Sequence, residues 1–382
     1  MGSKLRIAQV APLVESVPPK HYGGTERIVA YLTEELVRLG HKVTLFASGD
    51  SITSAELVPV CRRSFRQNKR ATDYLSREVL LMEHVMQRAG EFDVIHFHTG
   101  CLHYLISRQL KVPYVTTLHG RLDTPELLRL YERFRDMPVI SISNAQRAPW
   151  PCANWQATIY HGLPHDLFRF HPEPGGYLAF LGRASPEKRV DRAIKIAKRV
   201  GIPLKIAAKI DPADRRYFKR EIEPLLNDLH IEWLGEISDK DKDEFLGNAY
   251  ALLFPIDWPE PFGLVMIEAM ACGTPVVAYA CGSVPEVMDD GVTGFVVNDI
   301  EKAVEATRRV CDLSRAKCRE AFEKRFTASR MANDYINVYT RLADSRMRRV
   351  EQSFQSAIRS FQSAGPADDK IRALTEREFQ KF

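Results

Sequence analysis

Two carboxylates eight positions apart, Glu260 and Glu268, stand in the most specific chemical pattern of this chain. They belong to E-P-F-G-L-V-M-I-E, which follows the strand-like run YALLFPI and enters a predicted helix. Glu268 lies about two turns into that helix, on the face of Leu264, where a carboxylate is costly to bury without hydrogen-bond donors. The paired hydroxyls of a sugar or a ribose would supply two donors. The pattern therefore predicts recognition of a polyhydroxyl ligand.

Two cations, Arg183 and Lys188, stand five residues apart in G-R-A-S-P-E-K, where a predicted strand ends and a helix begins. A forked guanidinium and an ammonium that converge there would neutralise a diphosphate. The alternative is a pair of surface cations, but the N-terminal end of a helix disfavours positive charge. We interpret the pair as an anion-binding site.

Glycines precede two of the predicted helices. Gly23 and Gly24 stand before a helix expected from Thr25, and Gly263 stands before the helix that carries Glu268. Glycine lets backbone amides approach a phosphate, which the helix N-terminus also favours. A plain tight turn is the alternative for Gly23 and Gly24. The patterns G-x-G-x-x-G and G-x-x-x-x-G-K-[ST] are absent, so neither a nicotinamide enzyme nor a P-loop NTPase is supported.

Histidines end two other strand-like runs. His119 closes VPYVTTLH, which would place it at the carboxyl end of a parallel strand, where ligands bind in such sheets. His96 and His98 in DVIHFHT share one side of their strand because side chains alternate. We interpret His98 and Thr99 as acceptor-side candidates and His96 as a core residue, since zinc would need further ligands.

An acidic run after Ser238 raises the question of a metal. Asp239, Asp241 and Asp243 form two overlapping D-x-D patterns, which bind divalent cations in some enzymes. They fall at the start of a predicted helix, where acidic residues favour the dipole and face solvent. We therefore predict capping, no catalytic metal and no cofactor.

Apolar strand-length runs alternate with helical patterns along the chain, which predicts an α/β fold of parallel sheets covered by helices. The runs are LRIAQVA, KVTLFAS, DVIHFH, VPYVTTLH, VISIS and TIYH, then YLAFLGR, PLKIAAKI, IEWLGEI, YALLFPI, PVVAYA and TGFVVN. The Pro- and Gly-rich segment between the two series predicts a boundary between domains 1–165 and 166–326. A helix over 327–345, with the apolar stripe Met331, Tyr335, Val338 and Tyr339, should pack back on the first domain. Residues 346–382 form a polar tail, either a loosely attached helix or disorder.

Composition is ordinary for a globular chain, with 45% hydrophobic and 27% charged residues and a net charge of +5. No apolar run is long enough to span a membrane, the N-terminus lacks signal-peptide features, and seven cysteines without C-x-x-C argue against a disulfide framework. We expect a cytoplasmic protein with no nucleic-acid partner. Residues 62–70 hold five cations around Phe65, which is consistent with peripheral contact at the inner face of the membrane or with a solvated loop.

Several motifs together resemble the family 4 retaining glycosyltransferases of GT-B fold. They are Y-G-G-T-E, D-V-I-H-F-H, T-L-H-G, G-R-A-S-P-E-K, P-E-P-F-G-L-V-M-I-E-A-M-A-C-G-T-P-V-V-A and G-S-V-P-E-V. The resemblance covers roughly residues 4 to 342 and implies two Rossmann-like domains that face each other across an interdomain cleft. It assigns the acceptor to the first domain and the nucleotide-sugar donor to the second.

The resemblance also implies a role for each motif residue. Arg183 and Lys188 would hold the donor diphosphate, Glu260 the hydroxyls of the transferred sugar and Glu268 those of the ribose. His119 would reach the sugar from the first domain. The remaining donor contacts would come from Gly23, Gly24, Lys209, Ile210, Gly235, Glu236, Ile237, Phe262, Gly263 and Leu264.

These roles predict an enzyme that moves a hexose-type sugar from a nucleoside-diphosphate sugar, with UDP or GDP, to an acceptor hydroxyl. Transfer would retain the anomeric configuration and need no metal. The acceptor is lipid-linked, phosphorylated or a small glycoside. The alternatives are a non-catalytic nucleotide-sugar binding protein and a nucleotide-sugar epimerase of the same fold.

Overall fold

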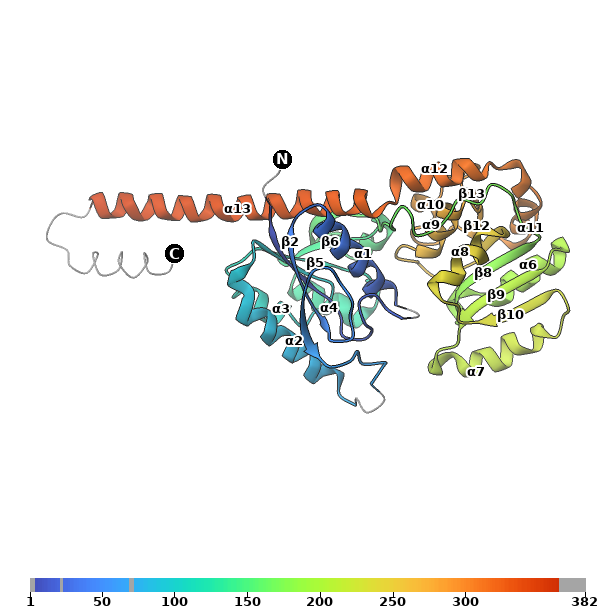
Figure 1. Ribbon diagram of the computed structural model, residues 1–382, viewed down its shortest axis with the longest axis horizontal. Coiled ribbons are helices and arrows are strands. Elements are labelled where there is room, and N and C mark those ends of the chain that lie inside the picture. Colours follow the sequence, from blue (N-terminus) through green and yellow to red (C-terminus); the bar gives the residue numbers. More distant parts are fainter. Residues whose placement is uncertain (1–3, 21–22, 69–71, 364–382) are drawn as a thin grey trace.

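The protein consists of two parallel β-sheets, each covered by helices, with a long helix at the C-terminal end (Figure 1). The computed structural model describes residues 4–20, 23–68 and 72–363. The seven-stranded first sheet has the order β3 (Glu56–Cys61), β2 (Lys42–Ser48), β1 (Arg6–Val10), β4 (Val94–Phe97), β5 (Tyr114–Thr117), β6 (Pro138–Ser141) and β7 (Asn154–Thr158).

The second sheet has six strands, and its neighbouring strands are also parallel. Its order is β10 (Ile231–Gly235), β9 (Leu204–Lys209), β8 (Tyr177–Arg183), β11 (Ala249–Phe254), β12 (Val276–Tyr279) and β13 (Gly294–Val297). In both sheets the chain starts near the centre and winds outward in both directions. This doubly wound order leaves a crevice at the carboxyl ends of the central strands, where ligands bind in such folds.

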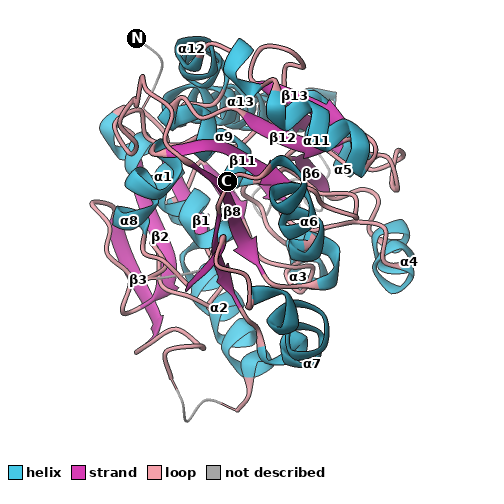
Figure 2. Ribbon diagram, turned by 90° about the vertical axis from the view of Figure 1, so that its right-hand side faces the viewer, coloured by secondary structure: helices cyan, strands magenta, loops and turns pink. Residues whose placement is uncertain are grey.

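Helices connect the strands and cover both faces of each sheet (Figure 2). In the first domain they are α1 (Gly24–Arg38), α2 (Tyr74–Arg88), α3 (Tyr104–Ser107), α4 (Pro125–Arg133) and α5 (Asn144–Arg147). In the second they are α6 (Val190–Val200), α7 (Arg215–Tyr217), α8 (Asp239–Gly247), α9 (Leu264–Cys272), α10 (Val284–Val287), α11 (Ile300–Arg308) and α12 (Arg315–Arg325). The last helix is α13 (Ala328–Ser363).

The core of the first domain includes the start of α13. Helix α1 buries an apolar stripe, Ile28, Leu32 and Leu36, in the same cluster as Ile7 of β1. Five buried residues of α13 belong to this cluster as well: Met331, Ala332, Tyr335, Val338 and Tyr339. The chain therefore leaves the second domain and returns to the first, as Figure 1 shows for the red helix along the blue and green elements.

Several predicted boundaries differ from the structure. Strand β3 was not predicted, because this edge strand contains Pro59 and is only half-buried. The last strand of the first sheet is Asn154–Thr158, not TIYH, since pairing with β6 ends at Thr158. Helix α1 begins at Gly24 with Gly23 at its cap position, so Thr25 is not the cap.

The basic segment 62–70 lies partly outside the described residues, because the structure describes it only as far as residue 68. Arg66 donates to Glu15 over 3.0 Å, and Arg77 of α2 donates to the carbonyl of Arg63 over 3.0 Å. These contacts hold part of the segment against the body of the domain. No helix in the described part of the chain is long and apolar enough to cross a membrane.

Candidate functional site

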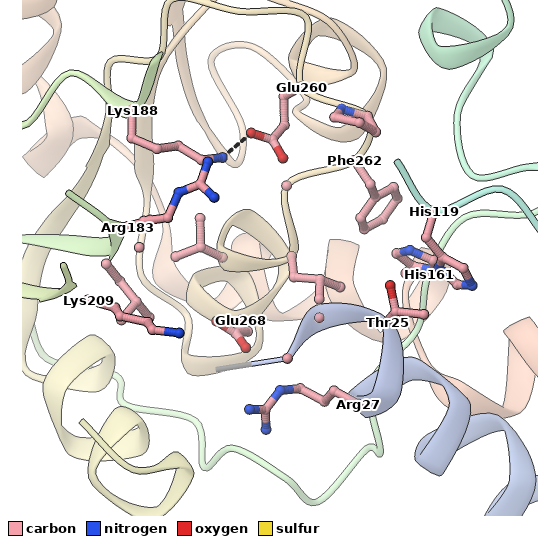
Figure 3. A pocket seen from close by; sticks show the side chains of 18 of the residues that line it. Thr25, Arg27, His119, His161, Arg183, Lys188, Lys209, Glu260, Phe262 and Glu268 are labelled. Atoms are coloured by element: carbon pink, nitrogen blue, oxygen red, sulfur yellow. Dashed lines mark hydrogen bonds and ion pairs between the residues drawn. The ribbon is translucent and has the colours of Figure 1, made fainter. Parts of the chain in front are cut away.

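A cavity of about 540 Å³ lies where the carboxyl ends of the two sheets face each other, a volume typical of small-molecule sites. The first domain contributes Gly23, Gly24, Thr25, Arg27 and His119. The second contributes Gly182, Arg183, Lys188, Lys209, Glu236, Ile237, Lys242, Trp258, Glu260, Phe262, Gly263, Leu264 and Glu268, and the linker contributes His161. Figure 3 shows Arg183, Lys188 and Lys209 on one side and Thr25 and His119 on the other.

Most of the predicted site residues therefore come together, but four do not line this cavity. Ile210 packs against the core beside α6, and Gly235 precedes the lining residues Glu236 and Ile237. His98 is 3% exposed and Thr99 is 7% exposed. Both are therefore buried beside the cavity, where His98 Nδ1 lies 2.9 Å from His119 Nε2, and their assignment to the acceptor side stays a prediction.

Lys188 and Glu260 form an ion pair inside the cavity, so neither charge stands alone. Trp258 donates from Nε1 to the same carboxylate oxygen of Glu260 over 2.8 Å. The ammonium of Lys188 also lies 4.8 Å from the ring centroid of Trp258, within cation–π range. A sugar hydroxyl that donates to Glu260 would meet a carboxylate already oriented by two partners.

Arg183 ends β8 and is surrounded by acidic groups of its own domain. It pairs with Glu187, and its guanidinium lies 3.7 Å from Asp211 and 3.7 Å from Asp214. About 30% of its side chain is exposed toward the cleft. These carboxylates already hold the guanidinium of Arg183 in place. A bound diphosphate would take over the position of one or more of them as its anionic partner.

Glu268 is 4% exposed and accepts a hydrogen bond from Lys242 Nζ over 2.9 Å. Lys242 also pairs with Asp239 over 3.3 Å, and Asp239 pairs with Arg27 of α1. Carboxylates and cations thus link α9, α8 and α1 across the cleft. Sequence reasoning missed Lys242 and Arg27. A usable signal existed, because each lies about one turn inside a predicted helix: Arg27 follows the glycine pair, and Lys242 lies within the acidic run.

The acidic run at the start of α8 is only partly solvent-facing, which corrects the prediction. Ser238 and Asp241 form a reciprocal capping box, in agreement with the predicted capping. Asp239 instead faces Arg27, and Asp243 accepts a 2.6 Å hydrogen bond from Arg169. Within residues 4–20, 23–68 and 72–363, no group of three or more His, Cys, Asp or Glu side chains is arranged to hold a metal ion.

Two glycines at this site leave no room for a side chain, and one of them, Gly263, also has a left-handed backbone. Gly263 caps α9 with φ of 79°, and a Cβ there would approach Met266 Cε to 2.7 Å. A Cβ on Gly23 would approach Pro19 Cβ to 2.8 Å. Because α9 begins at Leu264, the first amides of this helix have no intrahelical acceptor and can bind an anion or a hydroxyl oxygen.

Two stacked imidazoles form the wall of the cavity on the side of the first domain. The ring centroids of His119 and His161 are 5.3 Å apart, and Phe262 meets His161 edge-on at 4.8 Å. Burial lowers the pKa of His119 to about 3 and places that of His161 well below its usual range. Both rings are therefore neutral near pH 7. Sequence reasoning missed His161 because H-G-L-P was interpreted only as a linker.

Acidification is expected to destabilise the first domain before most carboxylates titrate. Burial lowers the pKa of His103, which is entirely buried, to about 3 from an unfolded value of 6.5. Between these pH values the unfolded chain binds more protons than the folded chain. The free energy of unfolding therefore decreases as the pH is lowered, by up to about 1.4 kcal/mol per pH unit. Urea unfolding at about pH 7 and about pH 5.5 measures this loss. His103→Gln should reduce the pH dependence, whereas an equal dependence in both proteins would contradict it.

Two protein families match this chain. "Glycosyltransferase Family 4" matches residues 22–161, and "Glycosyl transferases group 1" matches residues 168–325. The two matches cover the first domain and the second domain, including the cavity between them. The chain is a family 4 glycosyltransferase.

Relatives and solved structures agree with this assignment. The chain is 25% identical to alpha-maltose-1-phosphate synthase of Mycolicibacterium smegmatis, over 88% of this chain and 100% of the relative. It is 24% identical to phosphatidyl-myo-inositol mannosyltransferase of Mycobacterium tuberculosis, over 89% and 98%. Sucrose-phosphate synthase from Thermosynechococcus elongatus superposes with a TM-score of 0.72 at 20% identity, covering 90% and 100%. Anabaena HepE in complex with UDP and glucose superposes with a TM-score of 0.68 at 20% sequence identity, covering 88% of this chain and 99% of that structure. The fold of this glycosyltransferase is therefore GT-B.

Proposed function

We propose that this glycosyltransferase moves a hexose from a nucleoside-diphosphate sugar to an acceptor hydroxyl, with retention of configuration and without a catalytic metal. The observation that carries the proposal is the ion pair of Lys188 and Glu260 beside the buried Glu268 in one cavity. A nucleotide-sugar donor has three parts to recognise: the diphosphate, the transferred sugar and the ribose. A cation suits the diphosphate, and one carboxylate suits the hydroxyl pairs of each of the other two. The neighbour that contains UDP and glucose supports the same class of donor.

The proposed reaction breaks the bond between the anomeric carbon and the diphosphate oxygen and forms a bond to the acceptor oxygen. The electron pair of the broken bond stays on the diphosphate, where Arg183 and Lys188 would stabilise the developing charge. Front-face attack would let the departing phosphate oxygen take the acceptor proton, so no protein base is required. Glu260 would hold the sugar hydroxyls, and a closed cleft would exclude water as a competing acceptor.

Glu268→Gln is expected to weaken binding of UDP- or GDP-sugars by about 10- to 100-fold, because a neutral amide replaces a charged acceptor of ribose hydroxyls. Titration calorimetry with both donor types measures the change. Glu301→Gln on α11 is the matched control, since its side chain is 72% exposed and lies outside the cavity. Equal affinities for wild type and Glu268→Gln would contradict the ribose contact.

Product analysis separates this proposal from its alternatives. Wild type is incubated with each donor, in EDTA, and with lipid-linked, phosphorylated and simple glycoside acceptors. We expect a glycoside with the anomeric configuration of the donor, as NMR coupling constants report. Donor binding without turnover would favour a binding protein, and conversion of the donor sugar without acceptor would favour an epimerase. Loss of turnover in EDTA, restored by a divalent cation, would contradict metal independence.

A further inference from the structure

A continuous hydrogen-bonded chain connects His119 in the cavity to Tyr339 of α13, which packs on the first sheet. His119 Nε2 lies 2.9 Å from His98 Nδ1, and His98 Nε2 lies 2.7 Å from Gln9 Oε1. Gln9 Nε2 donates to the hydroxyl oxygen of Tyr339 over 3.1 Å. Gln9 and Tyr339 are 0% exposed and His98 is 3% exposed, so water does not compete for these bonds.

The amide of Gln9 sets the direction of this chain. Its nitrogen donates to Tyr339, so its oxygen, which can only accept, faces His98. His98 must then carry its proton on Nε2. Burial holds the pKa of His98 well below its usual range, so this ring is neutral and its Nδ1 is an acceptor. His119 consequently donates from Nε2 to His98.

Tyr339 holds Gln9 in this orientation, because its hydroxyl accepts from Gln9 and can donate to His96. Tyr339 accepts from Gln9, so its own hydrogen is available to His96 Nδ1, which lies 2.6 Å away. His96 Nε2 lies 2.7 Å from Thr117 Oγ1, which in turn lies 3.0 Å from the hydroxyl of Tyr335. These donors and acceptors agree with one direction along the whole chain, so the buried partners of Gln9 support each other.

The same chain leaves one ring nitrogen of the cavity histidine unused. A neutral His119 with its proton on Nε2 presents a lone pair at Nδ1. This atom is buried and has no hydrogen-bond partner in the described part of the chain, and His119 lines the cavity. An unpartnered buried acceptor is costly unless a ligand satisfies it.

We propose that Gln9, His98 and Tyr339 are positioning residues that hold His119 with its proton on Nε2, so that Nδ1 accepts a hydrogen bond from a hydroxyl of the transferred sugar. Helix α13 thereby takes part in donor selection, although its residues do not line the cavity. The inference rests on the proposed function for the identity of the ligand. The tautomer of His119 does not depend on the ligand and can be measured without it.

The first test is the ¹⁵N NMR spectrum of the imidazoles in wild type, Tyr339→Phe and Gln9→Met, with His119 assigned from His119→Gln. We expect a protonated Nε2 and an unprotonated Nδ1 in wild type, and a mixture of tautomers in both variants. Tyr335→Phe is the matched control, because Tyr335 lies on the same helix and is equally buried. Within the hydrogen-bonded series described above, its hydroxyl contacts only Thr117. It should leave the tautomer unchanged.

The second test is donor kinetics with analogues that lack one sugar hydroxyl at a time. Tyr339→Phe should raise the KM for the full donor by about tenfold with a smaller change in kcat, and this penalty should vanish for one deoxy analogue. If Tyr339→Phe does not fold by circular dichroism, Gln9→Met carries both tests. A wild-type His119 with its proton on Nδ1, or a tautomer unchanged in both variants, would overturn the inference. Absence of nucleotide-sugar binding by wild type would instead overturn the proposed function.

Discussion

Lys188→Met is expected to lower kcat/KM for the nucleotide sugar by about 1,000-fold, which corresponds to about 4 kcal/mol of transition-state stabilisation. Two effects combine in this variant. The departing diphosphate loses a cation inside a cavity that excludes water, and Glu260 keeps a buried charge without its ion-pair partner. Steady-state kinetics with varied donor concentration measure the change, and a decrease in kcat shows that the interaction strengthens in the transition state.

The control for this prediction is Lys195→Met on α6. The side chain of Lys195 is 58% exposed and its pairing with Asp191 over 3.6 Å lies outside the cavity, so activity should be unchanged. The double variant Lys188→Met/Glu260→Gln removes both charges of the ion pair. Relative to Lys188→Met, the double variant should regain folding stability, because no buried charge is left unpaired. It should regain little activity, because the contact to the diphosphate is still missing. A loss of less than tenfold in Lys188→Met would contradict a role at the diphosphate.

Arg315→Met is expected to lower the free energy of unfolding by about 3 to 5 kcal/mol, the largest stability effect that we predict. Arg315 opens α12, is 7% exposed and donates to four oxygens, three of them in fully buried bonds. They are the carbonyls of His171 (2.7 Å), Ala249 (3.0 Å) and Gly247 (2.7 Å) and Oγ1 of Thr274 (2.7 Å). Methionine has a similar length but leaves all four acceptors without this donor.

Urea unfolding followed by tryptophan fluorescence measures this loss as a lower midpoint at constant slope. Lys317→Met is the matched control, since this exposed residue lies on the same helix and should change stability by less than about 0.5 kcal/mol. The stability prediction is independent of the proposed reaction. A midpoint equal to wild type would mean that other groups satisfy the four oxygens when Arg315 is absent.

The order of strands and helices was largely predictable because burial imposes a local pattern. The runs LRIAQVA and YLAFLGR are continuous apolar strands, as central parallel strands require, and both form. Strand β3 was missed because an edge strand is half-buried, and its Pro59 weakens the pattern. The C-terminal helix was predicted over 327–345, with a loosely attached helix or disorder beyond it, whereas α13 continues to Ser363.

The site was predictable where chemistry follows a strand and less so where partners come from elsewhere. Arg183, Lys188, Glu260 and Glu268 all line the cavity, since carboxyl ends of parallel strands meet at one edge. Alternation correctly put His96 and His98 on one side of β4. The prediction of His96 as a core residue is confirmed, but the pattern did not reveal that His98 is buried as well, because a central strand is covered on both faces.

By itself the sequence determined the alternation of elements, the glycines at helix starts and the charged groups that follow the strands. These features depend on backbone sterics and burial within a few residues of each position. Only the tertiary structure decided the partners: Lys188 with Glu260 across 72 positions, Lys242 with Glu268 across 26, and Gln9 with Tyr339 across 330. Such pairs form because packing brings separate elements together, and no local pattern records which side chains then meet.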